Sequence, residues 1–266
     1  MTIGRTALVL IAIPLALTGC TYHEIRAPIA AQEADRADIE TFGPVSFQQL
    51  APDIWQHTSY LDVPGFGGVS SNGLLVVDGG SSLLVDTAWT SDQTEAIVRW
   101  AETRLGKPIR AAVVTHAHSD KMGGMAALHN ANIATYANAL TNRLAPENGL
   151  IPANYDIAFD AKGWAIGHAA QVLAPLKIYS PGGGHSADNI TVGVGSASLA
   201  FGGCLIKGTD APSLGNLADA DISHYATAVS NFGAAFPDAK IIAMSHSPAE
   251  GRAAIAHSVK MAKELN

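Results

Sequence analysis

Cysteine, charged residues and long apolar runs are all scarce in this sequence. Only two of the 266 residues are cysteines, Cys20 and Cys204, so the chain can form at most one internal disulfide. Charged residues make up 15% of the chain, and the formal net charge is -7, with Lys and Arg scattered rather than clustered. The missing basic stripe argues against nucleic acid as a partner. A hydrophobic content of 48% is typical of a globular protein, and the length suits one large domain.

The first apolar run, residues 7–17, is too short for a comfortable transmembrane span. Arg5 precedes the run and Leu17-Thr18-Gly19-Cys20 ends it, so residues 1–19 are predicted to be a secretory signal peptide. This ending resembles the lipobox of bacterial lipoproteins, which implies cleavage before Cys20 and lipidation of its thiol. An ordinary signal peptide with an incidental Cys20 is the alternative.

Residues 20–44 are rich in Ala, Glu, Asp and Gln and lack a sustained apolar period, and they are predicted to form a lipid-anchored tether. The folded domain is predicted to cover residues 45–266. A lipidated Cys20 cannot join a disulfide, which would leave Cys204 as a free thiol in an oxidising compartment. Metal ligation would explain why such a thiol persists.

Beyond residue 45, short strands alternate with helices in two similar halves. Strands are expected at residues 54–58, 74–77, 83–85, 111–115, 133–136, 176–179, 190–194, 199–201 and 241–243, and helices at 91–105, 123–128, 137–144, 221–235 and 247–264. The last helix is expected to start with a capping box at Ser247-Pro248-Ala249-Glu250. This pattern predicts the α/β class, with two sheets packed face to face and helices outside.

The segment from Leu61 to Val69 carries apolar side chains among three glycines and a proline. Such a composition favours a mobile hairpin loop, and this loop could close over a site as a lid. The alternative is a hairpin tip whose hydrophobic residues are incidental.

The apolar run from Ala111 to Thr115 ends in His116-Ala117-His118-Ser119-Asp120 and, after two more residues, two glycines. His116 and His118 are spaced two apart, so both imidazoles can face the same side where the strand ends. Imidazole nitrogen and carboxylate oxygen are zinc ligands, and three such groups together predict part of a metal site.

Three later residues also follow predicted strands, next to flexible backbone or at the start of a helix: His185, Cys204 and His246. With the motif they supply two sets of three ligands. His116, His118 and His185 would form one set, and Asp120, Cys204 and His246 the other. Three protein ligands leave a zinc position open for water, so two adjacent sets predict a catalytic centre with two zinc ions.

The motif with His185, Cys204 and His246 resembles the class B metallo-β-lactamases whose second metal site is Asp-Cys-His. Further likeness lies in Asp62 to Gly67, Thr115 to Gly124, Ala134 to Leu140 and Phe201 to Lys207, and it covers nearly all of the chain from the lipobox to the last helix. Ser119 and Gly183 depart from the expected Gln and Pro. The family implies an αβ/βα four-layer sandwich with two mixed sheets.

The resemblance also implies what the protein does and where. The family uses two zinc ions per subunit to hydrolyse the β-lactam amide bond of penicillins, cephalosporins and carbapenems, and so confers antibiotic resistance. The expected location is the periplasm, with the lipid on Cys20 anchoring the chain to the outer membrane. The expected partners are small β-lactam substrates, and no protein partner is predicted.

Carried over residue by residue, the resemblance assigns roles around the metals. A hydroxide between the zinc ions would attack the lactam carbonyl, with Asp120 holding the second zinc and orienting the hydroxide. Asn216 would help to stabilise the oxyanion, and Lys207 would pair with the substrate carboxylate. The apolar wall and lid would be formed by Leu61, Val63, Phe66 and Trp89.

Two rival functions would share parts of this pattern. A glyoxalase-like thioesterase or a lactonase would have His directly after the motif Asp and a bridging Asp late in the chain. Lys121 and Cys204 stand at those two positions and favour the β-lactamase. A noncatalytic zinc-binding lipoprotein would have a closed site without an apolar wall.

Overall fold

The larger of two sheets takes its strands in chain order. The computed structural model describes Met1 and residues 39–265. In this part of the chain the larger sheet contains β1 (Ile39–Phe42), β2 (Val45–Ala51), β3 (Ile54–Val63), β4 (Gly67–Asp78), β5 (Ser81–Val85), β6 (Ile109–Val113), β7 (Ala134–Asn138), β8 (Tyr155–Phe159) and β9 (Ala165–Ile166). Strands β1 to β5 are antiparallel to their neighbours, whereas β5 to β8 are parallel. Parallel strands bring their carboxyl ends to one edge of the sheet, where α/β proteins commonly bind ligands.

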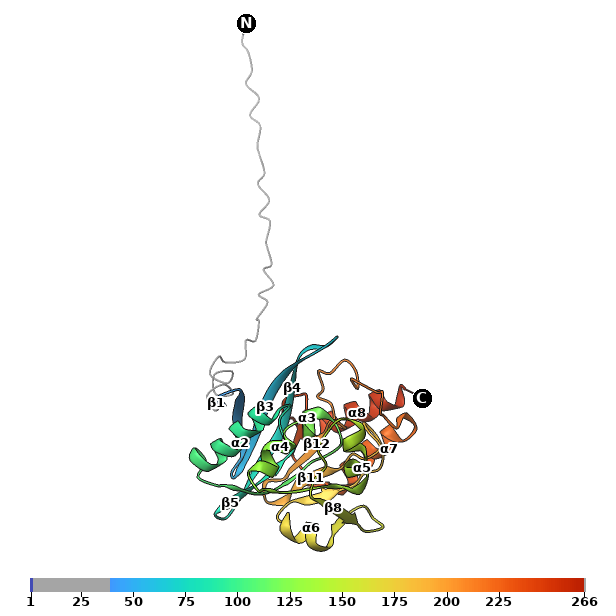
Figure 1. Ribbon diagram of the computed structural model, residues 1–266. Coiled ribbons are helices and arrows are strands. Elements are labelled where there is room, and N and C mark those ends of the chain that lie inside the picture. The colour runs from blue at the N-terminus through green and yellow to red at the C-terminus, as the bar shows by residue number, and fades with distance from the viewer. Residues whose placement is uncertain (2–38, 266) are drawn as a thin grey trace. The chain divides into compact units, whose positions relative to one another are not determined.

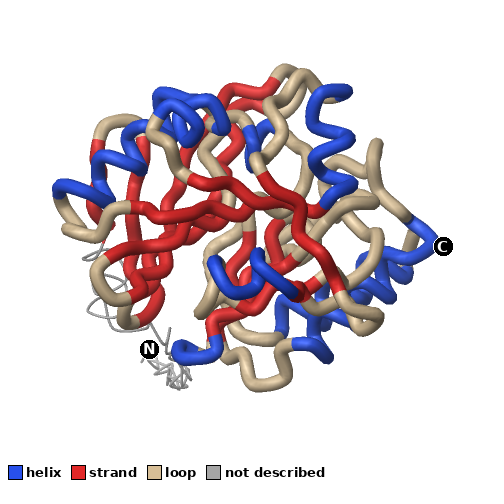
Figure 2. The backbone as a smooth tube through the Cα atoms, turned by 60° about the horizontal axis from the view of Figure 1, so that its bottom comes forward, coloured by secondary structure: helices blue, strands red, loops and turns tan. Residues whose placement is uncertain are grey.

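The smaller sheet lies later in the chain and is flanked by the last two helices. Its strands are β10 (Lys177–Tyr179), β11 (Thr191–Val194), β12 (Leu199–Gly203) and β13 (Ile241–Met244), of which β12 and β13 are parallel. The helices are α2 (Ser91–Thr103), α3 (Ser119–Met122), α4 (Met125–Asn130), α5 (Ala139–Glu147), α6 (Gly167–Val172), α7 (Ile222–Ala235) and α8 (Ala253–Lys263), and η1 (Gly195–Ala197) is a single 3-10 turn. Figure 2 shows the strands running through the middle of the body with helices around them.

Alternation along the strands of the larger sheet separates two apolar layers. Leu83 and Val85 point to the layer between the sheets, where they share a cluster with Phe201 of the smaller sheet. Leu84 points the other way and joins Trp100 of α2 in a second cluster. Each face of the strand is therefore buried, which explains why residues 83–85 of β5 and 111–113 of β6 are apolar without alternation.

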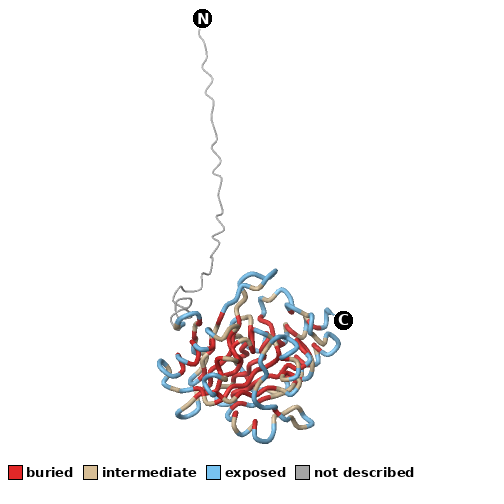
Figure 3. The backbone as a smooth tube through the Cα atoms, in the orientation of Figure 1, coloured by how far each residue is buried: buried red, intermediate tan, exposed pale blue. Residues whose placement is uncertain are grey.

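The smaller sheet is covered in the same way on its outer face. Ile242 and Met244 of β13 pack with Phe232 of α7 and Ile255 of α8. The resulting order is helices, sheet, sheet, helices, which confirms the predicted sandwich of two mixed sheets with helices outside. Figure 3 shows the buried residues concentrated in the middle of this arrangement and the exposed ones around it.

The folded domain begins earlier than the predicted boundary at Val45. Strand β1 lies within the predicted tether of residues 20–44 and pairs antiparallel with β2, Ile39 facing Gln48. Strand β1 is an edge strand whose residues alternate between exposed and half-buried, so it needs few apolar residues. That composition hid it from a prediction based on apolar periodicity.

The predicted capping box at Ser247 is wrong, and α8 starts at Ala253. The backbone of Glu250 instead pairs with Ile242 of β13, with N···O distances of 2.7 and 3.0 Å. The carboxylate of Glu250 accepts hydrogen bonds from Thr209, and the hydroxyl of Ser247 accepts one from the Gly208 amide. Both box residues thus bind the loop after β12, and neither caps a helix.

Some predictions lie outside the described residues, and some elements of the structure had not been predicted. The signal peptide of residues 1–19 and the lipidation site Cys20 lie outside the described part of the chain and stay predictions. Strands β2, β8 and β9 and helices α3 and α6 were not predicted from the sequence. Among the helices of the described residues, none is both long and apolar enough to cross a membrane.

His57 makes stability depend on pH. Its ring is fully buried in β3 against Gly73, and Nε2 donates to the carbonyl of Asp86 at 3.2 Å. Burial, and then the charge of Lys121, lower the pKa of His57 to about 4 from an ordinary value of 6.5. The unfolded chain therefore takes up this proton below pH 6.5, while the folded chain resists it down to about pH 4.

We expect this one group to remove about 3 kcal/mol from the free energy of unfolding between pH 6.5 and pH 4. Urea unfolding of the wild type and of His57→Gln at pH 7 and pH 4.5 measures the effect. The variant should be less stable at pH 7 and should lose less stability on acidification. Equal losses in the two proteins would contradict the assignment.

Candidate active site

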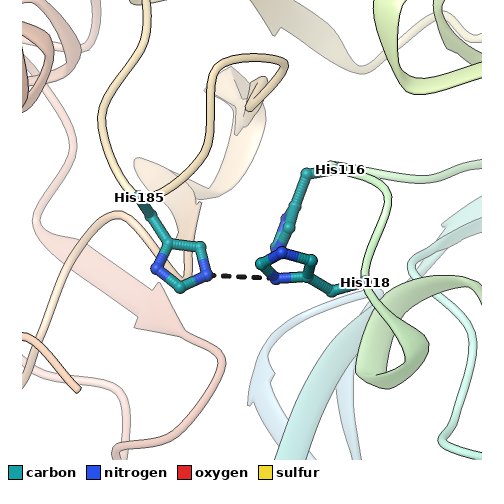
Figure 4. Close-up of side chains that lie close together, drawn as sticks. All are labelled: His116, His118 and His185. Atoms are coloured by element: carbon teal, nitrogen blue, oxygen red, sulfur yellow. Dashed lines mark hydrogen bonds between the residues drawn. The ribbon is translucent and has the colours of Figure 1, made fainter. Parts of the chain in front are cut away.

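Three histidines from two loops meet at the edge of the sandwich. His116 and His118 follow β6, and His185 lies in the loop between β10 and β11. The Nε2 atom of His185 lies 3.3 Å from Nδ1 of His118, and one ring nitrogen of each histidine lies within 4.8 Å of the others. Figure 4 shows the His185 ring on one side and the His116 and His118 rings on the other, turned toward one another. The first predicted ligand set is therefore assembled.

The second predicted ligand set is equally compact. The Sγ atom of Cys204 lies 3.5 Å from Oδ2 of Asp120 and 3.3 Å from Nε2 of His246. The distance from His246 Nε2 to the same Asp120 oxygen is 3.4 Å. On its other side, His246 Nδ1 donates to the carbonyl of Ser70 at 2.6 Å, which aims Nε2 at the other two ligands.

The strand order explains why residues so far apart in sequence meet. Strands β12 and β13 are parallel neighbours, so Cys204 and His246 emerge at the same sheet edge. Gly203 has a φ of 58°, a left-handed conformation that favours glycine and turns the chain sharply before Cys204. Asp120 comes from the first turn of α3, directly after His118. The ligands thus sit on short connections at the ends of buried strands.

The donor set fits zinc. Imidazole nitrogen, thiolate sulfur and carboxylate oxygen are the ligands that zinc takes in proteins. The Nε2 atom of His116 is buried and has no hydrogen-bond partner among the described residues, while its Nδ1 lies 3.1 Å from the hydroxyl of Thr115. A buried imidazole nitrogen without a partner is costly, and a metal ion at the centre of the cluster would satisfy it. Ligand atoms of His116, Asp120 and Cys204 also lie within 4.8 Å of one another, so the two sets adjoin.

The charges around the second set keep Cys204 and Asp120 ionised, whereas His246 would have to release a proton to bind a metal. Burial raises the pKa of the Cys204 thiol, but the surrounding imidazoles and Lys121 outweigh it and hold the pKa well below its ordinary value. Burial lowers the pKa of His246, but Cys204 and Asp120 outweigh it and raise the pKa to about 9. Despite burial, Lys121 and His246 also keep the pKa of Asp120 below its ordinary range. Cys204 and Asp120 are therefore anionic at neutral pH, the state that binds zinc.

A buried network behind the ligands was not predicted from the sequence. The Nζ atom of Lys121 lies 3.2 Å from the carboxylate of Asp120 and 3.8 Å from that of Asp86, and it donates to Ser71 at 2.8 Å. Asp86 in turn accepts from the backbone amide and hydroxyl of Thr115 at 2.7 and 3.0 Å. A carboxylate directly after the apolar strand β5, at the same sheet edge as the motif, was the available signal.

A cleft of about 460 Å³ opens over the ligands. Its lining combines four of the predicted metal ligands with apolar and polar side chains from the surrounding loops: Val63, Phe66, Val69, Trp89, Ala117, His118, Ser119, Asp120, Asn148, Leu150, His185, Lys207, Ala211, Ser213, Gly215, Asn216, Asp219, His246 and Ser247. Figure 1 shows the β3–β4 hairpin projecting beyond the body on the side where the loop after β12 also rises. Both line the same cleft, so they form its two rims.

The structure brings all but one of the predicted substrate-binding residues to this cleft. Val63, Phe66 and Trp89 form part of its apolar side, and Phe66 at the hairpin tip is 69% exposed. Leu61 does not line it. Leu61 is exposed farther from the hairpin tip, and its partner across the hairpin, Val69, takes that place.

The two predicted polar residues lie on the opposite rim. Lys207 is only 6% exposed yet reaches the cleft. The side-chain oxygen of Asn216 accepts from the Ala218 amide at 3.1 Å, which leaves its NH2 group as the donor available to a bound molecule. Asp219, on the same loop, was not predicted; its carboxylate lies 3.1 Å from His118 Nε2.

Comparison with known proteins agrees with this geometry. The family model described as the metallo-beta-lactamase superfamily matches residues 66–246. The metallo-beta-lactamase type 2 of Pseudomonas aeruginosa is 32% identical over 76% of this chain and 78% of its own. A crystal structure of a metallo-beta-lactamase from Erythrobacter litoralis, with beta-mercaptoethanol in its active site, has 65% identity and a TM-score of 0.84 over 85% of this chain and 100% of that one.

A third relative bears on the metal. The metallo-beta-lactamase FIM-1 from Pseudomonas aeruginosa, solved in its mono-zinc form, is 46% identical, with a TM-score of 0.79 over 85% of this chain and 97% of that one. Shared fold, sequence and ligand cluster lead to one conclusion. The chain belongs to the metallo-beta-lactamase superfamily.

Proposed function

We propose that this protein hydrolyses the amide bond of β-lactam antibiotics, including penicillins, cephalosporins and carbapenems, with two zinc ions. The main observation behind this proposal is that two adjoining sets of three potential zinc ligands lie at the floor of a cleft. One rim of this cleft is apolar, and the other bears Lys207. His116, His118 and His185 would hold one zinc ion, and Asp120, Cys204 and His246 the other. Zinc bound in sets of three protein ligands supplies a Lewis acid and a water that ionises near neutral pH.

The chain's own residues bind and orient the substrate. Lys207 lines the cleft, and its ammonium would be a point charge that suits the carboxylate of a β-lactam. The NH2 group of Asn216 can donate to the lactam oxygen as negative charge develops there, which favours the transition state over the ground state. Asp120 stays ionised and could accept a hydrogen bond from a water held between the two ligand sets.

The apolar rim contributes by excluding water. Phe66 projects from the hairpin tip and Trp89 lies at the base of the same rim, so a substrate ring seated between them loses apolar surface to solvent. Burial of about 100 Å² of apolar surface is worth about 2.5 kcal/mol. Polar contacts on one rim and apolar contacts on the other would hold the lactam ring over the ligand sets.

Metal removal tests the proposal. A panel of one penicillin, one cephalosporin, one carbapenem and a thioester should be assayed with the full chain before chelation, after chelation and after return of zinc. We expect chelation to abolish β-lactam turnover and zinc to restore it, with about two zinc ions per chain by metal analysis. A protein that binds zinc and cleaves the thioester fast, but turns over none of the β-lactams, would refute the proposal.

A further inference from the structure

The segment that carries His116 and His118 is not part of a strand or a helix. Strand β6 ends at Val113 and α3 begins at Ser119, so the ligands lie on a connection without ladder hydrogen bonds. Buried backbone amides and carbonyls in such a connection need other partners. For Ala117, between the two ligands, those partners are the side chains of Asp188 and Asn148.

Asp188 has an unusual position for a carboxylate. It is 1% exposed, and its Oδ2 atom accepts from the Ala117 amide at 2.9 Å and from the Thr141 hydroxyl at 2.7 Å. Burial of a charged group is costly unless specific contacts compensate. Asp188 lies only three residues after His185, so it belongs to the loop that delivers the third imidazole.

Besides the contact between the His185 and His118 rings, two hydrogen bonds to the backbone of the motif segment tie the His185 loop to it. One is the backbone bond from the Ile190 amide to the Thr115 carbonyl at 2.9 Å, and the other is the Asp188 carboxylate on Ala117. From the other side, Asn148 Nδ2 donates to the Ala117 carbonyl at 2.6 Å. The peptide between the two motif histidines is thus held at both of its polar atoms, and one of the two partners moves with His185.

We infer that Asp188 is a positioning residue for the three-histidine ligand set: as a hydrogen-bond acceptor it fixes the Ala117 peptide to the His185 loop and so sets the spacing of the three imidazoles. The inference rests on the proposed zinc binding and deepens it. Asp188 is not part of the cleft lining, and among the described residues it makes no hydrogen bond to a ligand side chain, so its hydrogen bonds reach the ligand set through the backbone.

In this inference, Asp188 acts through its hydrogen-bond acceptor oxygen and not through its negative charge. An amide oxygen can accept from Ala117 and Thr141 as a carboxylate oxygen does, so Asp188→Asn keeps both bonds. Asp188→Ala removes the acceptor and leaves the Ala117 amide buried and unpaired. Thr141→Val removes one donor to the carboxylate and leaves the bond to Ala117 in place, which makes it the matched control.

Zinc binding by the full chain, stripped of metal with a chelator, provides the readout. Competition with a chromophoric chelator in a Cys204→Ser background, where the second set lacks its thiolate, makes one equivalent of zinc report mainly on the three histidines. We expect Asp188→Ala to weaken this binding about tenfold or more, as loss of an orienting partner commonly does. The zinc affinities of Asp188→Asn and Thr141→Val should stay within about threefold of that of the Cys204→Ser protein, compared with the tenfold loss expected for Asp188→Ala.

A general loss of stability must be separated from loss of positioning. Ile178→Ala, in the core between the sheets, should cost about 2–5 kcal/mol of stability without changing zinc affinity. Equal affinities for Asp188→Ala and Ile178→Ala would overturn the inference, and so would an Asp188→Asn protein that binds as weakly as Asp188→Ala.

If Asp188→Ala does not fold, Asn148→Ala decides, because Asn148 is exposed and holds the same peptide from the other side. Weaker zinc binding by this variant would support the inference, and unchanged binding would overturn it. A wild type that binds zinc but cleaves no β-lactam would refute the proposed function alone, since this test reads metal binding.

Discussion

Cys204→Ser should lower kcat/KM for a carbapenem by about 100-fold or more and should reduce zinc content toward one ion per chain. The thiolate is the softest ligand of the second set, and its pKa is held low by the imidazoles and Lys121 around it. A serine hydroxyl stays protonated at neutral pH and is a poor zinc ligand. Loss of a Lewis acid removes several kcal/mol of transition-state stabilisation, and 2.7 kcal/mol already corresponds to about 100-fold in rate.

The measurement is steady-state kinetics at several zinc concentrations, paired with metal analysis after gel filtration. If Cys204 binds the second zinc ion, kcat/KM of Cys204→Ser should recover in part as the zinc concentration is raised. The reason is that Asp120 and His246 still offer a weaker binding site. Ser245→Ala is a suitable control. Its hydroxyl is buried beside His246 and has no hydrogen-bond partner among the described residues. If Cys204→Ser kept the zinc content and the kcat/KM of the wild type, Cys204 would not be a zinc ligand.

The positions of the ligands could be predicted because each one follows a locally recognisable pattern. The apolar run 111–114, which starts in β6, is fully buried, and the histidines follow shortly after it. The strands before Cys204 and His246 have the same form, with glycine before Cys204. The order of strands in a sheet then brings these ends together, and the fold class follows from the alternation of strands and helices.

The groups that support the ligands could not be predicted, because their partners lie far away along the chain. Asp86 precedes Thr115 by 29 positions, and Asp188 follows Ala117 by 71. In sequence each appears as a polar residue at the end of a strand or in a turn. Their burial depends on contacts between loops that are far apart in the sequence, and the periodicity of apolar residues does not predict such contacts. The misplaced start of α8 has the same origin, since the capping-box residues were used by the loop at Thr209.

From the sequence, Lys121 served only to separate rival functions, and the structure adds an electrostatic role. Its side chain is fully buried, and it is the only lysine or arginine that forms an ion pair with a carboxylate of the ligand sets among the described residues. Two carboxylates, Asp86 and Asp120, lie within 4 Å of its Nζ atom. Burial lowers the pKa of Lys121, but Asp120, Cys204 and Asp86 outweigh it and raise the pKa, so the ammonium stays charged.

We expect Lys121→Ala to lower the free energy of unfolding of the metal-free protein by about 3–5 kcal/mol, the usual cost of removing one member of a buried ion pair. The reason is that Asp86 and Asp120 would remain buried without a cation between them. Burial raises the pKa of Asp86 to about 6 even though Lys121 opposes it, so without the ammonium this carboxyl should be protonated at neutral pH and hold Thr115 less firmly.

Urea unfolding at pH 7 measures this loss, with Lys162→Ala as the control. Lys162 is an exposed turn residue whose contact in the turn is made by its backbone amide, so its substitution should change stability by less than about 0.5 kcal/mol. A Lys121→Ala protein as stable as Lys162→Ala would mean that the two carboxylates tolerate each other without the ammonium. The expected loss would instead identify Lys121 as the counter-ion of two buried acids, the candidate metal ligand Asp120 and Asp86 behind it.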